Sequence, residues 1–295
     1  MSDANLEQMA AELEATGRYR ILRRLDPPAP SPTTESGARL GIFVDFETTG
    51  LDPARDEIIE IAMVPFSYTV DGRICGFGEP FNQLRQPSSP IPPEVTALTG
   101  IDDALVEGKT IDPAEVAHFV APAALVVAHN AGFDRRFAER FCDVFTTKAW
   151  ACSMSEIDWS AEGFESSKLA YLALAQGFFY ERHRAVHDCA AAIELLARPL
   201  PRSGLTGMQR LLASARAPTW RIWAEHSPFD FKDILKARGY RWNGEENGKP
   251  RSWWIDVRDD QKDAEIAFLC REIYQRETPI NARRMTAYDR FSDRC

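Results

Sequence analysis

Apolar runs alternate with helical patterns through the middle of the chain. Five runs have the length and composition of buried strands, at 41–47, 57–66, about 73–83, 124–128 and 149–153. Helical spacing of apolar residues occurs between and after them, near 111–120, 133–142, 167–176 and 187–197. The turn between the first two strands suits an antiparallel hairpin, and the later strands alternate with helices. The pattern therefore predicts an α/β domain with a mixed five-stranded sheet flanked by helices.

Segments of different composition flank this core. Residues 4–16 have a helical pattern, 17–25 form a basic strand or helix, and a linker rich in Pro and Ser covers 26–37. We therefore divide the chain into an N-terminal arm and linker at 1–38, a central domain at 39–200, a second linker at 201–219 and an accessory domain at 220–295.

The accessory domain contains five of the seven tryptophans. Residues 230–243 predict a helix that ends at Gly239 and is followed by a strand. A turn at 245–250, a strand at 252–257 and a helix at 261–276 complete a small α+β unit. Its aromatic residues, interleaved with Arg241, Lys249 and Arg251, suit stacking on single-stranded bases. A small core built from a few large side chains explains the same residues, and both interpretations stay open.

Two carboxylates stand out at the end of the first strand. Asp45 and Glu47 are two residues apart, so their side chains point to the same face of the strand. The apolar residues before them indicate a buried strand, where neighbouring acids repel each other and are costly to desolvate. A divalent cation removes both costs, and oxygen ligands suit Mg²⁺ or Mn²⁺.

Two later segments place further acids at the ends of apolar elements. The strand near 124–128 breaks at 129–132, and Asp134 falls in the first turn of the helix that begins at Phe133. Residues 181–196 place His183 in a loop and Asp188 at the start of an Ala- and Leu-rich helix. The order of these acidic positions along the chain predicts one shared site.

These segments resemble the DEDDh group of DnaQ-like 3′→5′ exonucleases, which includes the proofreading epsilon subunit of bacterial DNA polymerase III. The family's first motif, D-x-E-T-T/S-G, is matched by residues 45–50, its second, H-N-x-x-F-D, by 129–134, and its third, H-x-A-x-x-D, by 183–188. Residues 91–101 resemble the helical segment that follows the third strand in this family. The resemblance spans about residues 40–198 and implies a ribonuclease H-like fold.

The resemblance implies a two-metal site. Two-metal hydrolysis of a phosphodiester needs an activated water and stabilisation of the developing charge. Four carboxylates, Asp45, Glu47, Asp134 and Asp188, offset the charge of two divalent cations, Mg²⁺ or Mn²⁺. In the family the first Asp bridges both ions, the Glu and the last Asp help to hold the ion that activates water, and the second-motif Asp supports the other ion.

His183 is the candidate general base. A histidine with an ordinary pKa near 6.5 suits removal of a proton from water at neutral pH. His187 lies outside the motif spacing and is interpreted as a supporting or exposed residue. His118 and His226 have no partner at motif spacing and are interpreted as structural. The residues that flank the acids are the candidate substrate contacts, namely Phe46, Thr48, Thr49, His129, Asn130 and Phe133.

Composition adds limits. No run of 18 apolar residues occurs, the first 20 residues are unlike a signal peptide, and the six cysteines have no metal-ligand spacing. We therefore expect a cytoplasmic protein with no membrane partner. The net charge of −9 is unevenly spread, because residues 41–200 carry 12 Lys and Arg against 24 Asp and Glu, whereas 201–295 carry 18 against 14. This distribution of charge suits a protein that contacts only a few phosphates at the end of a nucleic-acid strand.

The expected function is metal-dependent removal of nucleotides from the 3′ end of DNA, most simply single-stranded, in replication proofreading or repair. A polymerase or repair protein is a possible partner through the accessory domain. An RNA-trimming exonuclease of the same family shares every motif, since the sugar is read by surrounding groups. A catalytically idle nucleic-acid-binding scaffold is the alternative outside enzymes, and the intact acids argue against it.

Overall fold

A long antiparallel pair of strands forms the centre of the computed structural model, which describes residues 3–33, 35–244 and 248–295. β2 (Arg39–Thr48) pairs with β3 (Ile58–Tyr68), from Arg39 opposite Tyr68 to Thr48 opposite Ile58. Ten of the eleven residues of β3 are buried, as expected for a strand with both faces covered. The chain divides into two compact units, 1–212 and 213–295, and this hairpin belongs to the first.

The sheet of the first unit is mixed, as predicted. β6 (Leu125–Ala128) runs parallel to β2, and β7 (Trp150–Cys152) runs parallel to β6. The strand order is β4-β3-β2-β6-β7, with the short strands β4 (Ile74–Phe77) and β5 (Phe81–Leu84) both antiparallel to β3. The sheet therefore has five positions across, as expected, but six strands.

The edge strand predicted at about 73–83 is split because of Pro65 in β3. A proline has no N–H to donate to a neighbouring strand. Beside Pro65 the edge is occupied by Gly78, whose N–H donates to the Pro65 carbonyl at 2.9 Å. Pro80 follows at once and interrupts the edge again. β4 therefore ends before this point and β5 begins after it.

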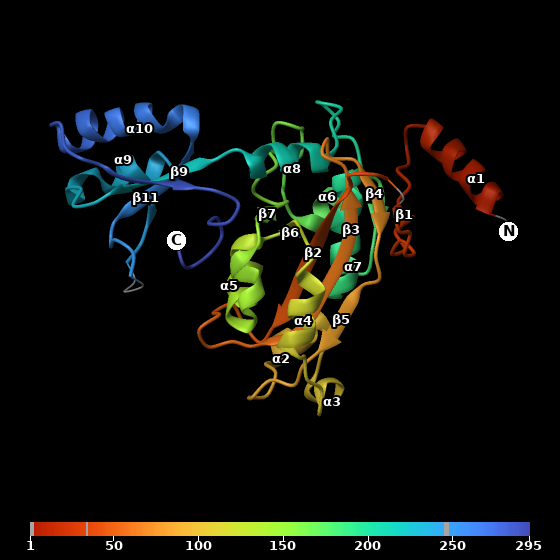
Figure 1. The fold of residues 1–295 in the computed structure, drawn as a ribbon. Helices are drawn as coiled ribbons and strands as arrows, with labels where there is room; N and C mark the ends of the chain where they lie inside the picture. The colour runs from red at the N-terminus through yellow and green to blue at the C-terminus, as the bar shows by residue number, and fades with distance from the viewer. Residues whose placement is uncertain (1–2, 34, 245–247) are drawn as a thin grey trace. The chain divides into compact units, whose positions relative to one another are not determined.

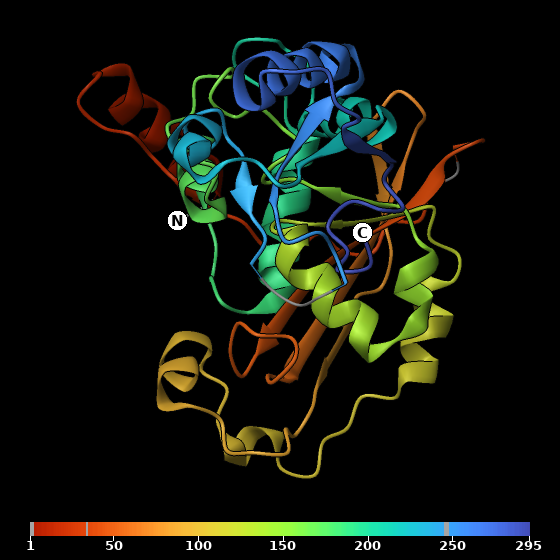
Figure 2. The same ribbon diagram turned by 90° about the vertical axis from the view of Figure 1, so that its left-hand side faces the viewer.

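Helices cover both faces of the sheet. α4 (Pro113–Val120) and α5 (Ala131–Phe141) lie in front of the strands and α7 (Ala185–Ala197) lies behind them (Figure 1). In the view turned by 90°, α5 crosses in front of β2 and β3 (Figure 2). α7 approaches the sheet closely because its inward positions are mostly alanine, and eight of its residues are buried.

The first unit has further helices and short strands, and the last of these helices continues past residue 212 into the second unit. They are α1 (Asp3–Ala15), β1 (Arg23–Arg24), α2 (Pro93–Thr99), α3 (Asp103–Val106), η1 (Asp143–Thr147), α6 (Leu169–Ala175), β8 (Phe178–Phe179) and α8 (Gly207–Arg216). The basic segment predicted at 17–25 contributes β1, which pairs in parallel with β8.

The second unit has its own four-stranded sheet. The order is β10-β11-β9-β12, formed by β10 (Arg241–Trp242), β11 (Trp253–Arg258), β9 (Thr219–Ala224) and β12 (Asn281–Met285). All of its strand pairs are antiparallel. Its helical segments are η2 (Phe229–Phe231), α9 (Lys232–Ala237), η3 (Asp259–Gln261), α10 (Lys262–Phe268) and the π-helical η4 (Leu269–Tyr274).

Sequence predictions for this unit are partly met. α9 is shorter than the predicted helix but is followed by Gly239 in the left-handed conformation, with φ of 96°, as expected. The predicted helix at 261–276 is present as α10 continued by η4. Strands β9 and β12 had not been predicted. Residues 245–247 of the predicted turn at 245–250 lie outside the described part of the chain.

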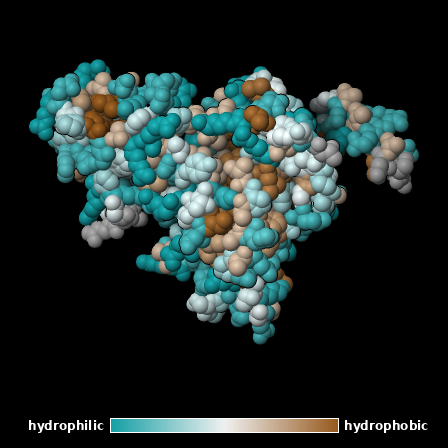
Figure 3. Space-filling model, viewed as in Figure 1, coloured by the Kyte–Doolittle hydropathy of each residue, from teal (hydrophilic) through white to brown (hydrophobic). Residues whose placement is uncertain are grey.

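The surface seen in Figure 3 is mainly hydrophilic, and its hydrophobic residues gather in a few small areas. Within the described ranges, every helix is too short or too polar to cross a membrane.

A test of the central hairpin concerns Gly41. An alanine Cβ at this position would lie 2.5 Å from Cζ of Phe66, its cross-strand partner, which is fully buried. We expect Gly41→Ala to lower the free energy of unfolding by about 1–3 kcal/mol, because the ring must shift within a close-packed core. Urea denaturation followed by circular dichroism measures the change.

Gly132→Ala is the matched control, since no atom lies within 4 Å of its added Cβ. Its unfolding midpoint should not fall. Adding Phe66→Leu to Gly41→Ala should recover part of the loss. An unchanged midpoint for Gly41→Ala alone would contradict the packing described for the hairpin.

Candidate active site

Asp45 and Glu47 lie on the same face of the central strand β2. Their cross-strand partners on β3 are Ala62 and Glu60, and the register shifts just after Glu47. Phe46, between them, turns to the other face, where its ring meets Phe145 edge-on at 6.4 Å. The alternation of the strand thus separates the carboxylates from the aromatic core.

Asp134 reaches the same site from the first turn of α5. Its N–H donates to the Asn130 carbonyl at 3.3 Å, which fixes the helix start, and its side chain is only 3% exposed. The backbone N–H of Phe46 donates to its carboxylate. One residue of β2 therefore orients an acid that comes from a helix about 90 residues later.

Asp188 enters from the first turn of α7. Tyr180 Oη donates to Asp188 Oδ1 at 2.9 Å, and the backbone N–H of His183 donates to Oδ2 at 2.9 Å. Both carboxylate oxygens therefore have a donor, which sets the direction of the side chain. His183 and Asp188 are five residues apart in the third motif, and this spacing lets the His183 N–H reach the Asp188 carboxylate.

The electrostatic effects of these groups show that they share one environment. Burial, followed by the charges of Asp134, Asp188, Glu47 and Glu60, raises the pKa of Asp45 well above its ordinary value. Burial and the charge of Asp188 raise the pKa of Glu47 to about 7. Burial raises the pKa of Asp134 to about 8, and burial also raises the pKa of Asp188. Proximity of like charges in a desolvated place is the physical cause of the first two shifts.

Glu60 is a further acid at this site that the sequence analysis missed. It is 1% exposed, it lies directly opposite Glu47, and its Oε2 has no hydrogen-bond partner. A signal was present, because an acid that interrupts the apolar run of 58–64 is unusual in a buried strand. Tyr180, the donor to Asp188, also went unnoticed.

His183 and His187 lie in different surroundings. His183 adopts a positive φ of 60°, is partly exposed, and interacts electrostatically with Asp188. His187 is on α7, where its Nδ1 is 3.6 Å from Glu181 Oε2. The structure therefore brings His183 to the acids and leaves His187 beside a different carboxylate.

His129 is engaged inside the protein through both ring nitrogens. Nδ1 is 2.9 Å from Ser153 Oγ and Nε2 is 2.8 Å from the Ser167 carbonyl oxygen. Burial lowers its pKa to about 4, so the ring is neutral. Neither nitrogen is left for a nucleotide, and His129 instead holds the turn before α5. Asn130 is exposed, and its carbonyl accepts the N–H groups of Phe133 and Asp134.

The remaining candidate contacts also have roles in the fold. Thr48 Oγ1 donates to the Gly50 carbonyl at 2.6 Å, and Thr49 Oγ1 accepts the Glu57 N–H at 3.0 Å, so both hydroxyls shape the loop between β2 and β3. Phe46 is 4% exposed, so its ring is not available to a substrate. Phe133 is partly exposed and its ring packs on Phe137 at 4.9 Å, leaving Phe133 as the aromatic residue beside the acids.

The donor set fits a hard divalent cation. Among the residues that the structure describes, no three His, Cys, Asp or Glu side chains converge closely enough to hold a metal ion. The available donors are all carboxylate oxygens, and Glu60 Oε2 has no hydrogen-bond partner in the described part of the chain. Burial, together with the neighbouring negative charges, raises the pKa values of Asp45 and Glu47. Cations in this site would offset the negative charge of the carboxylates.

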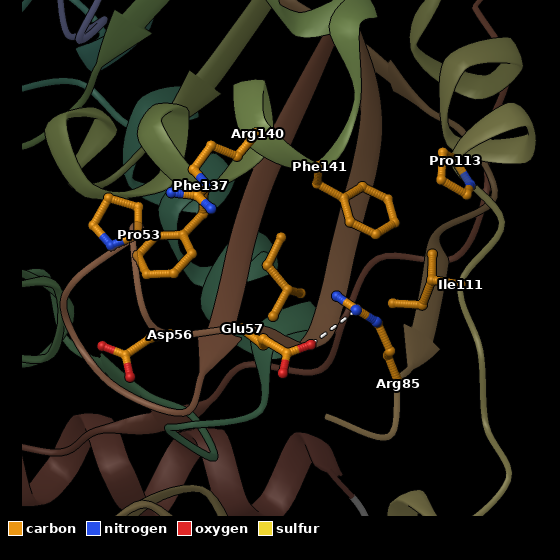
Figure 4. Close-up of a pocket in the computed structure, with 10 residues that line it drawn as sticks. Pro53, Asp56, Glu57, Arg85, Ile111, Pro113, Phe137, Arg140 and Phe141 are labelled. Atoms are coloured by element: carbon orange, nitrogen blue, oxygen red, sulfur yellow. Dashed lines mark hydrogen bonds and ion pairs between the residues drawn. The ribbon is translucent and has the colours of Figure 1, made fainter. Parts of the chain in front are cut away.

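A pocket of about 410 Å³ lies beside the loop between β2 and β3 (Figure 4). Phe137, Arg140 and Phe141 line one side of it, and Arg85 Nη2 donates to Glu57 Oε2 at 2.9 Å on the other. Hydrogen bonds from Ser88 lower the pKa of Glu57, so that residue stays charged. None of the four motif acids lines the pocket. Its two arginines are balanced by Asp56 and Glu57, so it offers no net attraction to phosphate.

Comparison with known proteins finds nucleases and DNA polymerase III proteins among the relatives of this chain. The Exonuclease family matches residues 42–196. Exodeoxyribonuclease 10 of Escherichia coli (strain K12) is 30% identical over 172 residues, which cover 57% of this chain and 71% of that protein. A DNA polymerase III PolC-type protein of Caldanaerobacter subterraneus subsp. tengcongensis is 32% identical over 185 residues, covering 60% of this chain and 13% of that protein. The chain thus spans only 12–13% of such PolC-type relatives.

Solved structures similar to this chain are also exonucleases. Exonuclease X in complex with 5′-overhanging duplex DNA has a TM-score of 0.43 and 27% identity, covering 59% of this chain and 99% of that one. Escherichia coli exonuclease I in complex with a dA16 oligonucleotide has a TM-score of 0.49 and 15% identity, covering 77% and 67%. The mixed sheet flanked by helices is the ribonuclease H-like fold. With more than half of its residues matched by the family, this chain belongs to the Exonuclease family.

Proposed function

We propose that this protein is a metal-dependent 3′→5′ exonuclease that hydrolyses phosphodiester bonds at the 3′ end of DNA, with single strands preferred. The observation that carries the proposal is that carboxylates from β2, α5 and α7 act on one another in one buried site. The three motifs support the direction, and the name of exodeoxyribonuclease 10 supports DNA as the substrate.

Asp45, Glu47, Asp134 and Asp188 would hold two divalent cations, Mg²⁺ or Mn²⁺. Exonucleases of this family generally use divalent metal ions. When bound, the cations would offset the carboxylate charges, polarise the scissile phosphate and make the attacking water more acidic. The chain itself prepares the ligands, because Phe46 N–H orients Asp134 while Tyr180 and His183 N–H orient Asp188. Little reorganisation is then needed when substrate arrives.

His183 would take the proton from the attacking water. It lies in a loop immediately before α7, next to Asp188 and partly open to solvent, so the proton can pass on to bulk water. Among the described residues its ring has no hydrogen-bond partner, which leaves a nitrogen to accept a proton. Phe133 would stack on the terminal base, since it is the partly exposed aromatic residue next to Asp134.

An RNA-trimming exonuclease is the second candidate, because the acids act on the phosphate and do not read the sugar. Rates on matched DNA and RNA oligonucleotides of one sequence separate the two. We also infer a role in replication proofreading or repair from the PolC-type relatives, with a polymerase or repair protein as partner. Co-purification of the full chain with replicative polymerase subunits tests that association.

The first test concerns the central acid. Asp45→Asn should lower cleavage of a 5′-labelled single strand by several orders of magnitude, because one charge is removed from the metal site while the side-chain shape is kept. Asp71→Asn, the same change at an exposed turn, should leave the rate unaltered. A phosphorothioate linkage at the 3′ end should block wild-type enzyme, whereas one at the 5′ end should not. Cleavage that continues in excess chelator would refute metal dependence.

The second test uses the pH dependence of stability. In the folded chain the pKa of Glu47 is about 7 and that of Asp134 about 8, above the values near 4 expected after unfolding. The folded state then binds more protons, so its stability is greatest below about pH 4 for these groups and falls as pH rises towards 8. In chelator, we expect Tm to fall between pH 5 and pH 8.

Mg²⁺ or Mn²⁺ should raise Tm more at pH 8 than at pH 6, because cations bind the deprotonated carboxylates. Asp45→Asn should be more stable than wild type in chelator at pH 8 and should gain less from the cation. Equal cation effects at both pH values, in both proteins, would show that the acids do not form the metal site.

The third test concerns the general base. His183→Ala should retain the cation-dependent rise in Tm, since the four carboxylates are intact. Its rate should fall by roughly 10²–10⁴-fold, because proton removal then depends on solvent. The residual rate should increase with pH as hydroxide replaces the base. His187→Ala, which removes the partner of Glu181, should have a far smaller effect. The opposite ranking of the two variants would assign the role to His187.

A further inference from the structure

The two faces of the sheet in the second unit have different coverings. Cross-strand partners in an antiparallel sheet point to the same face. Ile222 with Ile255 and Ala282, and Ala224 with Trp253, face the apolar core formed with Leu235, Leu269 and Ile273. These last three residues belong to α9 and η4, and Figure 1 shows α10 along the same side. The helices therefore cover one face only.

One row of side chains crosses the opposite face. Arg241 of β10, Trp254 of β11, Trp223 of β9 and Asn281 of β12 are successive cross-strand partners. The Arg241 guanidinium lies over the Trp254 ring at 4.1 Å from its centroid, and that of Arg221 lies over it at 4.3 Å. Trp254 thus holds a planar cation of the edge strand in a fixed orientation.

The two arginines on Trp254 differ in charge balance. Arg221 is 9% exposed, and its Nε and Nη2 donate to Asp256 at 2.8 and 2.9 Å, so its charge is offset. Arg241 is exposed and, among the described residues, forms no ion pair. Stacking orients Arg241 without neutralising it. A planar cation presented in this way can contact a phosphate or stack on a base.

A pocket of about 220 Å³ lies at the other end of the row. Trp223 and Asn281 line it together with His226, Tyr274 and Arg276. The volume is below the range of about 300–1,000 Å³ typical of drug-sized ligands, so the pocket suits one planar group. Arg276 is exposed and, within the described ranges, also has no ion pair. The acid in the pocket, Glu225, accepts a hydrogen bond from Asn281 Nδ2 at 2.7 Å.

The rest of this face is covered by the end of the chain. Arg221 Nη1 donates to the Cys295 carbonyl at 2.9 Å, and Arg283 Nη2 lies 3.5 Å from Asp289. The chain end therefore covers the row of Arg221. In the row of Arg241, Arg241 and Asn281 are exposed, Trp254 is partly exposed and Trp223 is buried at the base of the pocket. The part that is left has aromatic rings and two cations, Arg241 and Arg276, that form no ion pair among the described residues, and its acid, Glu225, accepts a hydrogen bond from Asn281.

We propose that this row and its pocket bind single-stranded nucleic acid. One base occupies the pocket beside Trp223, and backbone phosphates contact Arg276 at one end of the row and Arg241 at the other. Aromatic rings with a cation at each end, beside a pocket for one planar group, suit a flexible polyanion with flat bases. The assignment rests on the proposed function, since the bound strand is the one whose end is cleaved in the first unit.

Charge supports nucleic acid over a protein partner. Residues 213–295 carry 16 Lys and Arg against 14 Asp and Glu, whereas 1–212 carry 19 against 30. The second unit is thus the part of the chain that does not repel a polyanion. A protein interface would more often be centred on apolar side chains with charged groups at the rim. Here Arg241 and Arg276, which form no ion pair within the described ranges, stand at the two ends of the aromatic row.

The test measures binding apart from cleavage. Full-length Asp45→Asn protein in chelator is titrated into fluorescently labelled dT15 and rU15, and anisotropy gives Kd at several salt concentrations. Arg241→Gln combined with Arg276→Gln should weaken binding about tenfold. It should also flatten the slope of log Kd against log salt by about 1.4, since two phosphate contacts are lost. The strand whose affinity falls, dT15 or rU15, identifies the sugar that this face accepts.

Lys236→Gln with Arg271→Gln is the matched control, because it removes the same charge from exposed positions on α9 and η4. Its Kd and salt slope should equal those of the parent. If the Arg241 and Arg276 variant also equals the parent with both strands, the proposal is overturned and protein docking becomes the assignment for this face. With Asp45 restored and Mg²⁺ present, the Lys236 and Arg271 control should cleave with the wild-type KM, whereas the Arg241 and Arg276 variant should have a raised KM. Loss of metal-dependent cleavage in the otherwise unaltered chain would instead contradict the proposed exonuclease, so the two failures stay distinguishable.

Discussion

Repulsion between carboxylates in a desolvated place is the constraint on which this molecule depends. Every major influence on Asp45 opposes its charged form, since burial and four neighbouring acids act in the same direction. Cys189, which follows Asp188, is fully buried with its Sγ within 3.9 Å of the Phe43 and Ala62 carbonyl oxygens, and burial raises its pKa well above the ordinary value. Such an arrangement costs stability unless a cation occupies it, so it is explained by function and not by folding.

The fold accommodates this cost through backbone geometry. β2 is central in the sheet, with β3 on one side and β6 on the other, and it cannot move to relieve the repulsion. α5 and α7 both place an acid in the first turn, where the free N–H groups of a helix favour negative charge. Donors from Phe46, Tyr180 and His183 then orient two of the four acids. Hydrogen bonds to the charged form partly offset burial, which is why the pKa of Asp188 rises less dramatically than that of Asp45.

The sequence pattern predicted the features that depend on neighbouring residues. It did not predict the contacts that depend on segments far away in the chain. The alternation of β2 and the first turns of α5 and α7 place all four acids, and these could be read from spacing. His129 contacts Ser153 and Ser167, which lie 24 and 38 residues further along the chain, so these two hydrogen bonds could not be predicted from the local sequence. Glu60 became a site residue only through its register with Glu47. β12 was missed because three of its five residues, Asn281, Arg283 and Arg284, are exposed and polar, as edge strands often are.

The same electrostatic constraint explains why one chain combines two units of opposite charge. Under the proposed function, a site built from acids would repel the phosphates of its substrate, and a bound cation would attract them only at short range because salt screens longer distances. Capture of a strand would therefore benefit from cations that belong to a different part of the chain and do not pair with the proposed metal ligands. Arg241 and Arg276 meet that condition, because they belong to a separate unit and have no carboxylate partner among the described residues. Separation of charge along the sequence would thus let one polypeptide bind a polyanion and still keep the acid cluster that the proposed chemistry requires.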